Sequence, residues 1–294
     1  MCAIQTNNWY CTGIIMSDNI SDVLHSRAMD EIIYNTTNYP VTLCLIIIQL
    51  FIYLYILNYS IDMTSIAYQY NYVVRDKQYY RIYTSTFTHL SIYHIGFNMY
   101  SLWSLRSIEL QYTSVTYIIY TLLLINGSML ILTIMSYVLV RLDYRQYADQ
   151  LSVGYSCVVF GIMSIQSVQY DIDTKFNLFG MIELPYILSP LISLLITQLI
   201  IRNASLIGHL AGIVIGYIIG LGVFDVLNNM IGLIVLLISS SLLLIISLVG
   251  ATDVHIPFIS TCIEQYQQRN NPQSKLTIVN GNIVYRAIPT DEQV

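Results

Sequence analysis

Charged residues are scarce in this 294-residue sequence: Asp, Glu, Lys and Arg make up 10% of it, whereas hydrophobic residues make up 55%. A soluble globular domain carries about 25% charged residues. The deficit, together with a mean hydropathy of +0.61, excludes a large soluble core. It indicates that most of the chain lies in a membrane.

Other absences narrow the function. The sequence has no cluster of basic residues and a net charge of -5, so nothing in it favours nucleic acid as a partner. Its five cysteines are scattered and follow no spacing typical of metal ligands or of a disulfide framework. The HExxH pattern of zinc hydrolases is missing, and so are the internal repeats of many transporters. We therefore expect no metal, no cofactor and no nucleic acid partner.

What the sequence does contain is seven apolar runs, each near the roughly 20 residues that a membrane-spanning helix needs. The runs cover about 40–58, 90–105, 115–140, 151–170, 184–201, 204–223 and 230–249. Pro190 interrupts the fifth run. The pattern predicts an all-α polytopic membrane protein, and the loop charges leave its orientation open.

The two ends of the chain are polar. We expect an N-terminal arm over 1–39 and a C-terminal tail over 251–294. Within the tail, β-branched residues flank Asn280-Gly281, which predicts a β-hairpin.

Two histidines lie well inside apolar runs, where an ionisable side chain is costly and marks a candidate functional site. His94 precedes Asn98 by four residues, so the two lie on one face of a helix. His209 is followed on its own face by Gly212 and Gly216, which would let another helix backbone approach closely.

The fourth run offers a matching surface of small residues, Cys157 and Gly161, directly after Ser156. Packing the two small surfaces together would bring the Ser156 hydroxyl beside the His209 imidazole. A serine becomes a strong nucleophile when a neighbouring base takes its proton, and histidine titrates near neutral pH. Glu109 and Glu183 lie at helix ends, so we expect a Ser-His dyad and no acidic third member.

Acyl transfer also requires hydrogen-bond donors for the oxyanion that forms during the reaction. His94 and Asn98 could supply two, and the backbone N–H of Ser156 a third. Taken singly, a membrane serine, a histidine or a glycine stripe is commonly explained by helix packing. Their combination in separate helices of one chain is what favours a catalytic site.

The segments "HLSIYHIGFNM", "GYSCVVFG" and "GHLAGIVIG" resemble, in order and spacing, the signature segments of the rhomboid intramembrane serine proteases. The resemblance extends over about 80–222 and is closest to the endoplasmic-reticulum subgroup of eukaryotes. It implies a six-helix rhomboid core over 40–224, followed by a seventh transmembrane helix over 229–250.

The resemblance also implies roles for individual residues. Ser156 would be the nucleophile, His209 the general base, and His94 and Asn98 the lining of the oxyanion hole. Gly154 would let the chain bend before the nucleophile, so that a shortened helix starts deep in the membrane.

Further residues have structural roles by the same resemblance. His89 would support the structure around the site, Tyr80-Arg81 would hold the first loop, and Glu109 would cap or pin a helix end. The sequence departs from the family pattern at Cys157, commonly glycine, and at Tyr80, commonly tryptophan. Cys157 is small but could crowd the sixth helix.

The leading hypothesis is a serine endopeptidase that cleaves single-pass membrane proteins through an acyl-enzyme, in the endoplasmic reticulum or another secretory-pathway membrane. The main alternative is a catalytically inactive relative that binds transmembrane clients for trafficking or degradation. A metal hydrolase using His89, His94 and His209 is a third hypothesis, and a channel or transporter a fourth. Substrate identity and oligomeric state stay open.

Overall fold

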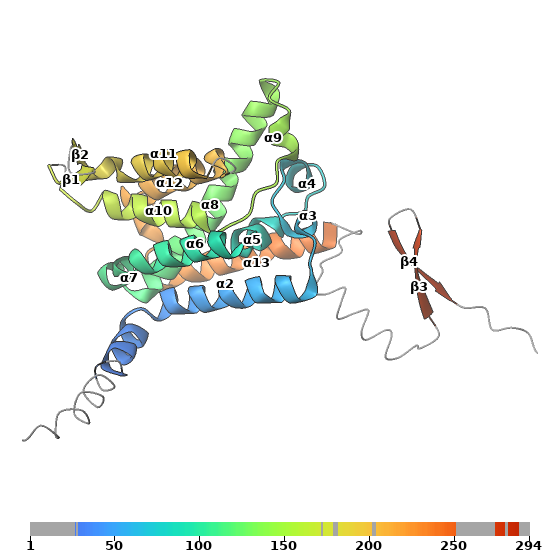
Figure 1. Cartoon of the computed structure of the whole chain (residues 1–294), viewed down its shortest axis with the longest axis horizontal. Coiled ribbons are helices and arrows are strands. Elements are labelled where there is room, and N and C mark those ends of the chain that lie inside the picture. The colour runs from blue at the N-terminus through green and yellow to red at the C-terminus, as the bar shows by residue number, and fades with distance from the viewer. Residues whose placement is uncertain are drawn as a thin grey trace, which may run out of the picture.

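The computed structural model describes residues 27, 29–171, 173–178, 182–201, 204–250, 274–279 and 282–287. Each of the seven predicted runs contains a helix (Figure 1). These helices are α2 (Pro40–Tyr59), α6 (Ile92–Ser104), α8 (Ser114–Arg141), α10 (Ser156–Ser167), α11 (Ser189–Ile200), α12 (Leu206–Gly220) and α13 (Met230–Gly250). The protein is an all-α polytopic membrane protein, as predicted.

The helices differ greatly in length. Within the described part of the chain, α2, α8 and α13 are long and apolar enough to cross a membrane. The helices α10 and α12 are shorter, with 12 and 15 residues. At 1.5 Å per residue, α10 measures only ~18 Å against a hydrocarbon layer of roughly 30 Å. It therefore begins or ends inside the membrane.

Two of the predicted runs begin earlier than the helices that they contain. The fourth was expected from 151, but α10 begins at Ser156, because Ser152 pairs with Tyr68 as an isolated β-bridge and Gly154 turns the chain. The fifth was expected from 184, yet α11 begins only at Ser189. Pro190 lies in its first turn, where the missing N–H has no helical partner to lose, so it starts the helix rather than interrupting it.

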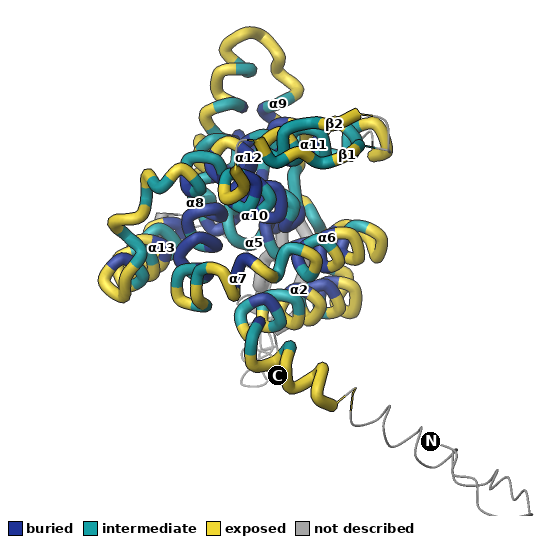
Figure 2. The backbone as a smooth tube through the Cα atoms, turned by 90° about the vertical axis from the view of Figure 1, so that its left-hand side faces the viewer, coloured by how far each residue is buried: buried dark blue, intermediate teal, exposed yellow. Residues whose placement is uncertain are grey.

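The core lies where α10 and α12 pack against each other and against α8 (Figure 2). An added Cβ at Gly212 would overlap the Cys157 carbonyl oxygen, and one at Gly216 would lie 2.7 Å from the Gly161 Cα. The two backbones thus touch along the glycine stripe, as the sequence predicted. Close backbone contact of this kind holds helices together in lipid, where burying apolar side chains adds little.

A long connection between α2 and α6 carries three short helices, α3 (Met63–Ile66), α4 (Tyr70–Val74) and α5 (Arg81–Phe87). Arg81 ties them together and is 4% exposed. Its Nη1 donates to the carbonyl oxygens of Thr64 and Ala67, both at 2.7 Å, and its guanidinium lies 4.2 Å from the Tyr72 ring centre. The loop is therefore a fixed part of the structure.

The outer helix α2 is attached at its start by Glu109, which belongs to α7 (Ser107–Tyr112). One carboxylate oxygen accepts the Val41 N–H at 2.9 Å. The other accepts the Thr42 N–H at 2.9 Å and the Thr42 hydroxyl at 2.7 Å. A carboxylate at the N-terminus of a helix is stabilising because the free N–H groups there carry partial positive charge.

The structure also contains two β-hairpins. The strands β3 (Ser274–Val279) and β4 (Asn282–Ala287) pair antiparallel around residues 280–281, which confirms the hairpin predicted in the tail. The strands β1 (Lys175–Leu178) and β2 (Ile182–Pro185) form a second hairpin between α10 and α11 that the sequence did not indicate. Of the predicted N-terminal arm, residues 29–38 are helical and 1–26 lie outside the described residues.

Candidate active site

Ser156 and His209 meet at the centre of the core. Ser156 is the first residue of α10, His209 lies in the first turn of α12, and the Ser156 Oγ is 2.8 Å from the His209 Nε2. This is the distance of a hydrogen bond, and it suits transfer of a proton from hydroxyl to imidazole. The contact predicted from the two small-residue surfaces is present.

The His209 ring is held in place by its surroundings. It is 7% exposed and lies against Phe160, one helical turn beyond Ser156, with ring centres 4.7 Å apart. Its Nδ1 is buried and has no hydrogen-bond partner among the described residues. Among the described residues, the polar contact of the His209 ring is therefore the one with Ser156.

Gly154 shapes the backbone just before Ser156. Its φ of +122° lies in a region that favours glycine, and its N–H donates to the Ser85 carbonyl oxygen at 2.9 Å. An added Cβ would lie 2.6 Å from the His94 Nε2 and 3.7 Å from the Ser156 Oγ. Only glycine fits between these groups, and the turn lets α10 begin at Ser156.

His94 therefore presents its Nε2 to the same small space as the Ser156 hydroxyl. Its Nδ1 accepts a long hydrogen bond, 3.5 Å, from the Leu90 N–H. An imidazole that accepts at Nδ1 carries its proton on Nε2 when neutral, so the atom that faces Gly154 is a donor. This is the arrangement that an oxyanion donor requires.

Asn98 lies one turn further along α6 and is 5% exposed. Its Nδ2 donates to the His94 carbonyl oxygen at 2.9 Å, within its own helix. An amide nitrogen has two N–H groups, so this bond leaves a second one for another acceptor. The hydrogen bond that the structure gives Asn98 thus lies within α6 and does not involve Ser156 or His209.

His89 is fully buried beneath the loop that leads to Ser156. Its Nε2 accepts the Tyr155 N–H at 3.5 Å, and its ring makes an edge contact with His94, with centres 5.0 Å apart. His89 thus supports Tyr155 and His94, and it does not reach the Ser156 hydroxyl. Within the described ranges, no group of three His, Cys, Asp or Glu side chains comes together as a metal site.

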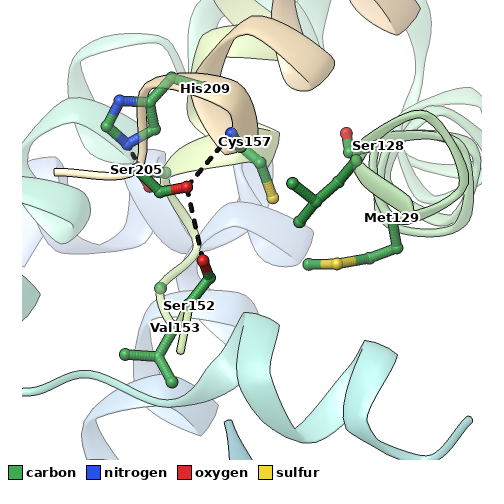
Figure 3. Close-up of a pocket in the computed structure, with 11 residues that line it drawn as sticks. Ser128, Met129, Ser152, Val153, Cys157, Ser205 and His209 are labelled. Carbon is green, nitrogen blue, oxygen red and sulfur yellow. Dashed lines mark hydrogen bonds between the residues drawn. The ribbon is translucent and has the colours of Figure 1, made fainter. Parts of the chain in front are cut away.

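A cavity of about 30 Å³ adjoins the pair and extends from Ser156 and His209 toward Met129 and Leu132 of α8 (Figure 3). Such a space can admit a water molecule, which needs about 10–15 Å³. The Cys157 side chain points toward Ser128 and Met129, whereas α12 approaches the Cys157 backbone. Its sulfur therefore does not crowd the sixth helix.

Two residues near the site were missed in the sequence. Ser205 caps α12, with its Oγ 3.3 Å from the Gly208 N, and lies 3.4 Å from the Ser152 hydroxyl (Figure 3). Ser85 contributes the carbonyl oxygen that holds Gly154. A serine just before an apolar run signals a helix cap and could have revealed Ser205. Backbone acceptors such as that of Ser85 leave no signal in a sequence.

Comparison with known proteins agrees with this architecture. The rhomboid domain family matches residues 76–226, just over half of the chain. Rhomboid-like protein 15 of Arabidopsis thaliana is 30% identical over 154 residues, which are 51% of this chain and 38% of that protein. Rhomboid-type serine protease 2 of Gibberella zeae is 31% identical over 145 residues, 49% of this chain and 52% of the relative. The chain thus spans about half or less of the length of these relatives.

A polytopic helical protein with a serine and a histidine in contact below its surface falls in the class of intramembrane serine proteases and their relatives. Within that class, this chain belongs to the rhomboid family.

Proposed function

We propose that this protein is an active intramembrane serine endopeptidase with a Ser156-His209 dyad. The observation that carries the proposal is the 2.8 Å contact between the hydroxyl oxygen and the imidazole Nε2. It supports a reaction in which His209 takes the Ser156 proton while the Ser156 Oγ attacks a peptide carbonyl carbon. The tetrahedral intermediate then carries its negative charge on the former carbonyl oxygen.

Three kinds of donor would stabilise that oxyanion. They are the Nε2–H of His94, the second amide N–H of Asn98, and the backbone N–H groups at the start of α10, where the helix dipole favours negative charge. Collapse of the intermediate breaks the C–N bond, and His209 gives its proton to the leaving amine. The acyl group stays on Ser156 as an ester.

Water completes the cycle. His209 takes a proton from water, whose oxygen attacks the ester carbonyl. The second tetrahedral intermediate then breaks its bond to the Ser156 Oγ, His209 returns the proton to that oxygen, and a carboxylic acid and the free Ser156 hydroxyl are released. The small cavity beside the pair is the route that we propose for this water. No cofactor takes part in any of these steps.

The proposed substrates are single-pass transmembrane proteins whose helix unwinds near small or helix-breaking residues and enters from the lipid. A secretory-pathway membrane, the endoplasmic reticulum first, is the proposed compartment. Its basis is the likeness of the "GYSC" and "GHLAGIVIG" segments to that subgroup, and imaging of the tagged protein tests it.

The test of the activity is cleavage of a tagged single-pass reporter by the purified protein in proteoliposomes. S156A and H209A are each expected to lower kcat/KM by about 10⁴ or more. S164A is the matched control, because Ser164 is a buried serine on the same helix that bonds only to the Phe160 carbonyl oxygen. It should cleave nearly as fast as wild type.

The inactive relative is the competing function. Cleavage that persists in S156A would reject the dyad. A wild-type protein that spares several reporters and does not react with a fluorophosphonate probe would instead support binding of transmembrane clients without cleavage.

A further inference from the structure

The seventh membrane helix, α13, contacts the protein through a narrow stripe. Only 11% of its most apolar stretch is buried, the lowest share among the three long helices of the described chain. Over residues 230–247, where burial is described, the buried positions are Gly232, Ser240 and Ser247. Their spacing of eight and seven residues places them on one face. The residues on that face are small, and two of them carry a hydroxyl group.

Ser247 closes the turn from which α5 begins. It is fully buried, and its Oγ accepts the Tyr80 N–H at 3.1 Å and donates to the Lys77 carbonyl oxygen at 3.3 Å. Lys77 has a φ of +56°, which is costly for a residue with a side chain. A turn with such a residue persists when its surroundings hold it, and Ser247 is bonded to both of its ends.

Ser240 is connected to α5 by hydrogen bonds through one side chain of α8. The Asn126 Nδ2 donates to the Ser240 Oγ at 3.2 Å, and the Asn126 Oδ1 accepts the Tyr83 hydroxyl at 2.7 Å. Tyr83 is a residue of α5. The seventh helix is therefore hydrogen-bonded to the beginning of α5 directly and to its middle through Asn126.

The same short helix holds the turn before the nucleophile. Ser85, near the end of α5, is 1% exposed and accepts the Gly154 N–H at 2.9 Å. Gly154 is two residues from Ser156 and is the position at which His94 and the Ser156 hydroxyl face each other. A shift of α5 would move Gly154, and misplacement by about 1 Å can cost two orders of magnitude in rate.

We propose that α13 positions the nucleophile: Ser247 and Ser240 fix α5, and α5 fixes Gly154 and hence Ser156. The two serines are positioning residues and touch neither the dyad nor the oxyanion donors. The proposal deepens the proposed protease function and rests on it for its effect on rate. The mechanical link from α13 to Gly154 can be measured without any catalysis.

The experiment compares S247A, S240A and the double variant with S239A in the full-length protein in proteoliposomes. Ser239 is the matched control, because it faces lipid on the same helix and bonds only to the Leu236 carbonyl oxygen. Two quantities are recorded: hydrogen exchange of the Gly154 amide, which bonds to the Ser85 carbonyl oxygen of α5, and the rate of Ser156 labelling by a fluorophosphonate.

Each lost interhelical hydrogen bond should speed Gly154 exchange by about threefold, and the double variant by about tenfold. Labelling and kcat should fall by similar factors, while KM for the reporter stays within about twofold of wild type, since substrate contacts are unchanged. S239A should match wild type in every quantity.

Gly154 exchange in the double variant at the rate of S239A would overturn the proposal, and so would equal labelling rates in an active protein. If wild type neither cleaves nor labels, the protease proposal fails, yet the exchange data still decide the link. Should the double variant not fold, Y83F removes only the hydroxyl that bonds Asn126 and gives the same test.

Discussion

The helices α12 and α13 are both aliphatic, yet one lies at the centre of the protein and the other at its edge. Along α12 the glycines touch the backbone of α10, and an added Cβ at Gly212 or Gly216 would overlap it. Along α13, Leu233 and Leu236 pack against the core from the side, and the polar contacts are hydrogen bonds of Ser240 and Ser247. The outer helix α2 is likewise attached by a polar group, the Glu109 carboxylate.

The two modes of attachment, backbone packing for α12 and hydrogen bonding for α13, are those expected of helices in lipid. Apolar side chains gain little by leaving lipid for protein, so helices associate through close backbone packing or through hydrogen bonds. In this protein the first mode builds the centre, where atoms must be fixed for chemistry. The second attaches the outer helices. Three comparisons of variants test this contrast.

The largest effect is expected for G212V. Its Cβ would overlap the Cys157 carbonyl oxygen, which belongs to the helix backbone and cannot move aside. We expect a loss of about 3 kcal/mol or more in the free energy of unfolding, measured by denaturation in mixed micelles. V214I, which adds a methyl group on the lipid-facing side of α12, is the control. A G212V protein as stable as this control would mean that the helices are not in backbone contact.

An intermediate effect is expected from matched truncations on the two helices. Ile215 on α12 is 6% exposed and packs over Gly127, whereas Ile245 on α13 is 55% exposed. I215A should cost about 2–5 kcal/mol through the cavity that it leaves, and I245A about 0.5 kcal/mol or less. The same unfolding measurement applies. Equal losses would show that α13 is buried by something that covers its outer face.

The smallest effect is expected for E109Q, which tests a polar attachment. The new amide would keep one acceptor oxygen but turn donors toward the Thr42 N–H and hydroxyl, which now donate to a carboxylate. We expect a loss of about 2 kcal/mol. E183Q is the control, because Glu183 is exposed and lies 3.9 Å from Lys175, so its loss should cost less than about 1 kcal/mol. Equal stability of the two variants would refute the attachment of α2 by Glu109.

Much of this arrangement could be predicted from the sequence. The apolar runs gave the helices, and the small residues after Ser156 and His209 gave their contact, because a glycine stripe specifies which faces meet. The "NG" pair at 280–281 gave the hairpin of the tail. In each case the signal was local or periodic.

The rest depended on contacts that no local pattern records. Glu109 was expected at a helix end, but the helix that it caps begins at Pro40, and its partner Thr42 lies 67 residues earlier in the chain. Ser240 and Ser247 could not be told from Ser239, because a helix that is apolar all round does not reveal which side faces the protein. Asn98 was expected to line the oxyanion hole, which stays a prediction, and the bond of its amide to the His94 carbonyl oxygen leaves one N–H for that role.

The shortness of α10 has a consequence for kinetics. With ~18 Å of helix in a hydrocarbon layer of roughly 30 Å, α10 has an end inside the membrane, and the proposed transmembrane substrates would reach Ser156 from the bilayer. The concentration that governs a proposed cleavage is then a mole fraction in the membrane. Diluting a suspension of proteoliposomes with buffer would leave the rate per enzyme unchanged, whereas fusing them with empty vesicles would lower it in proportion to the added lipid.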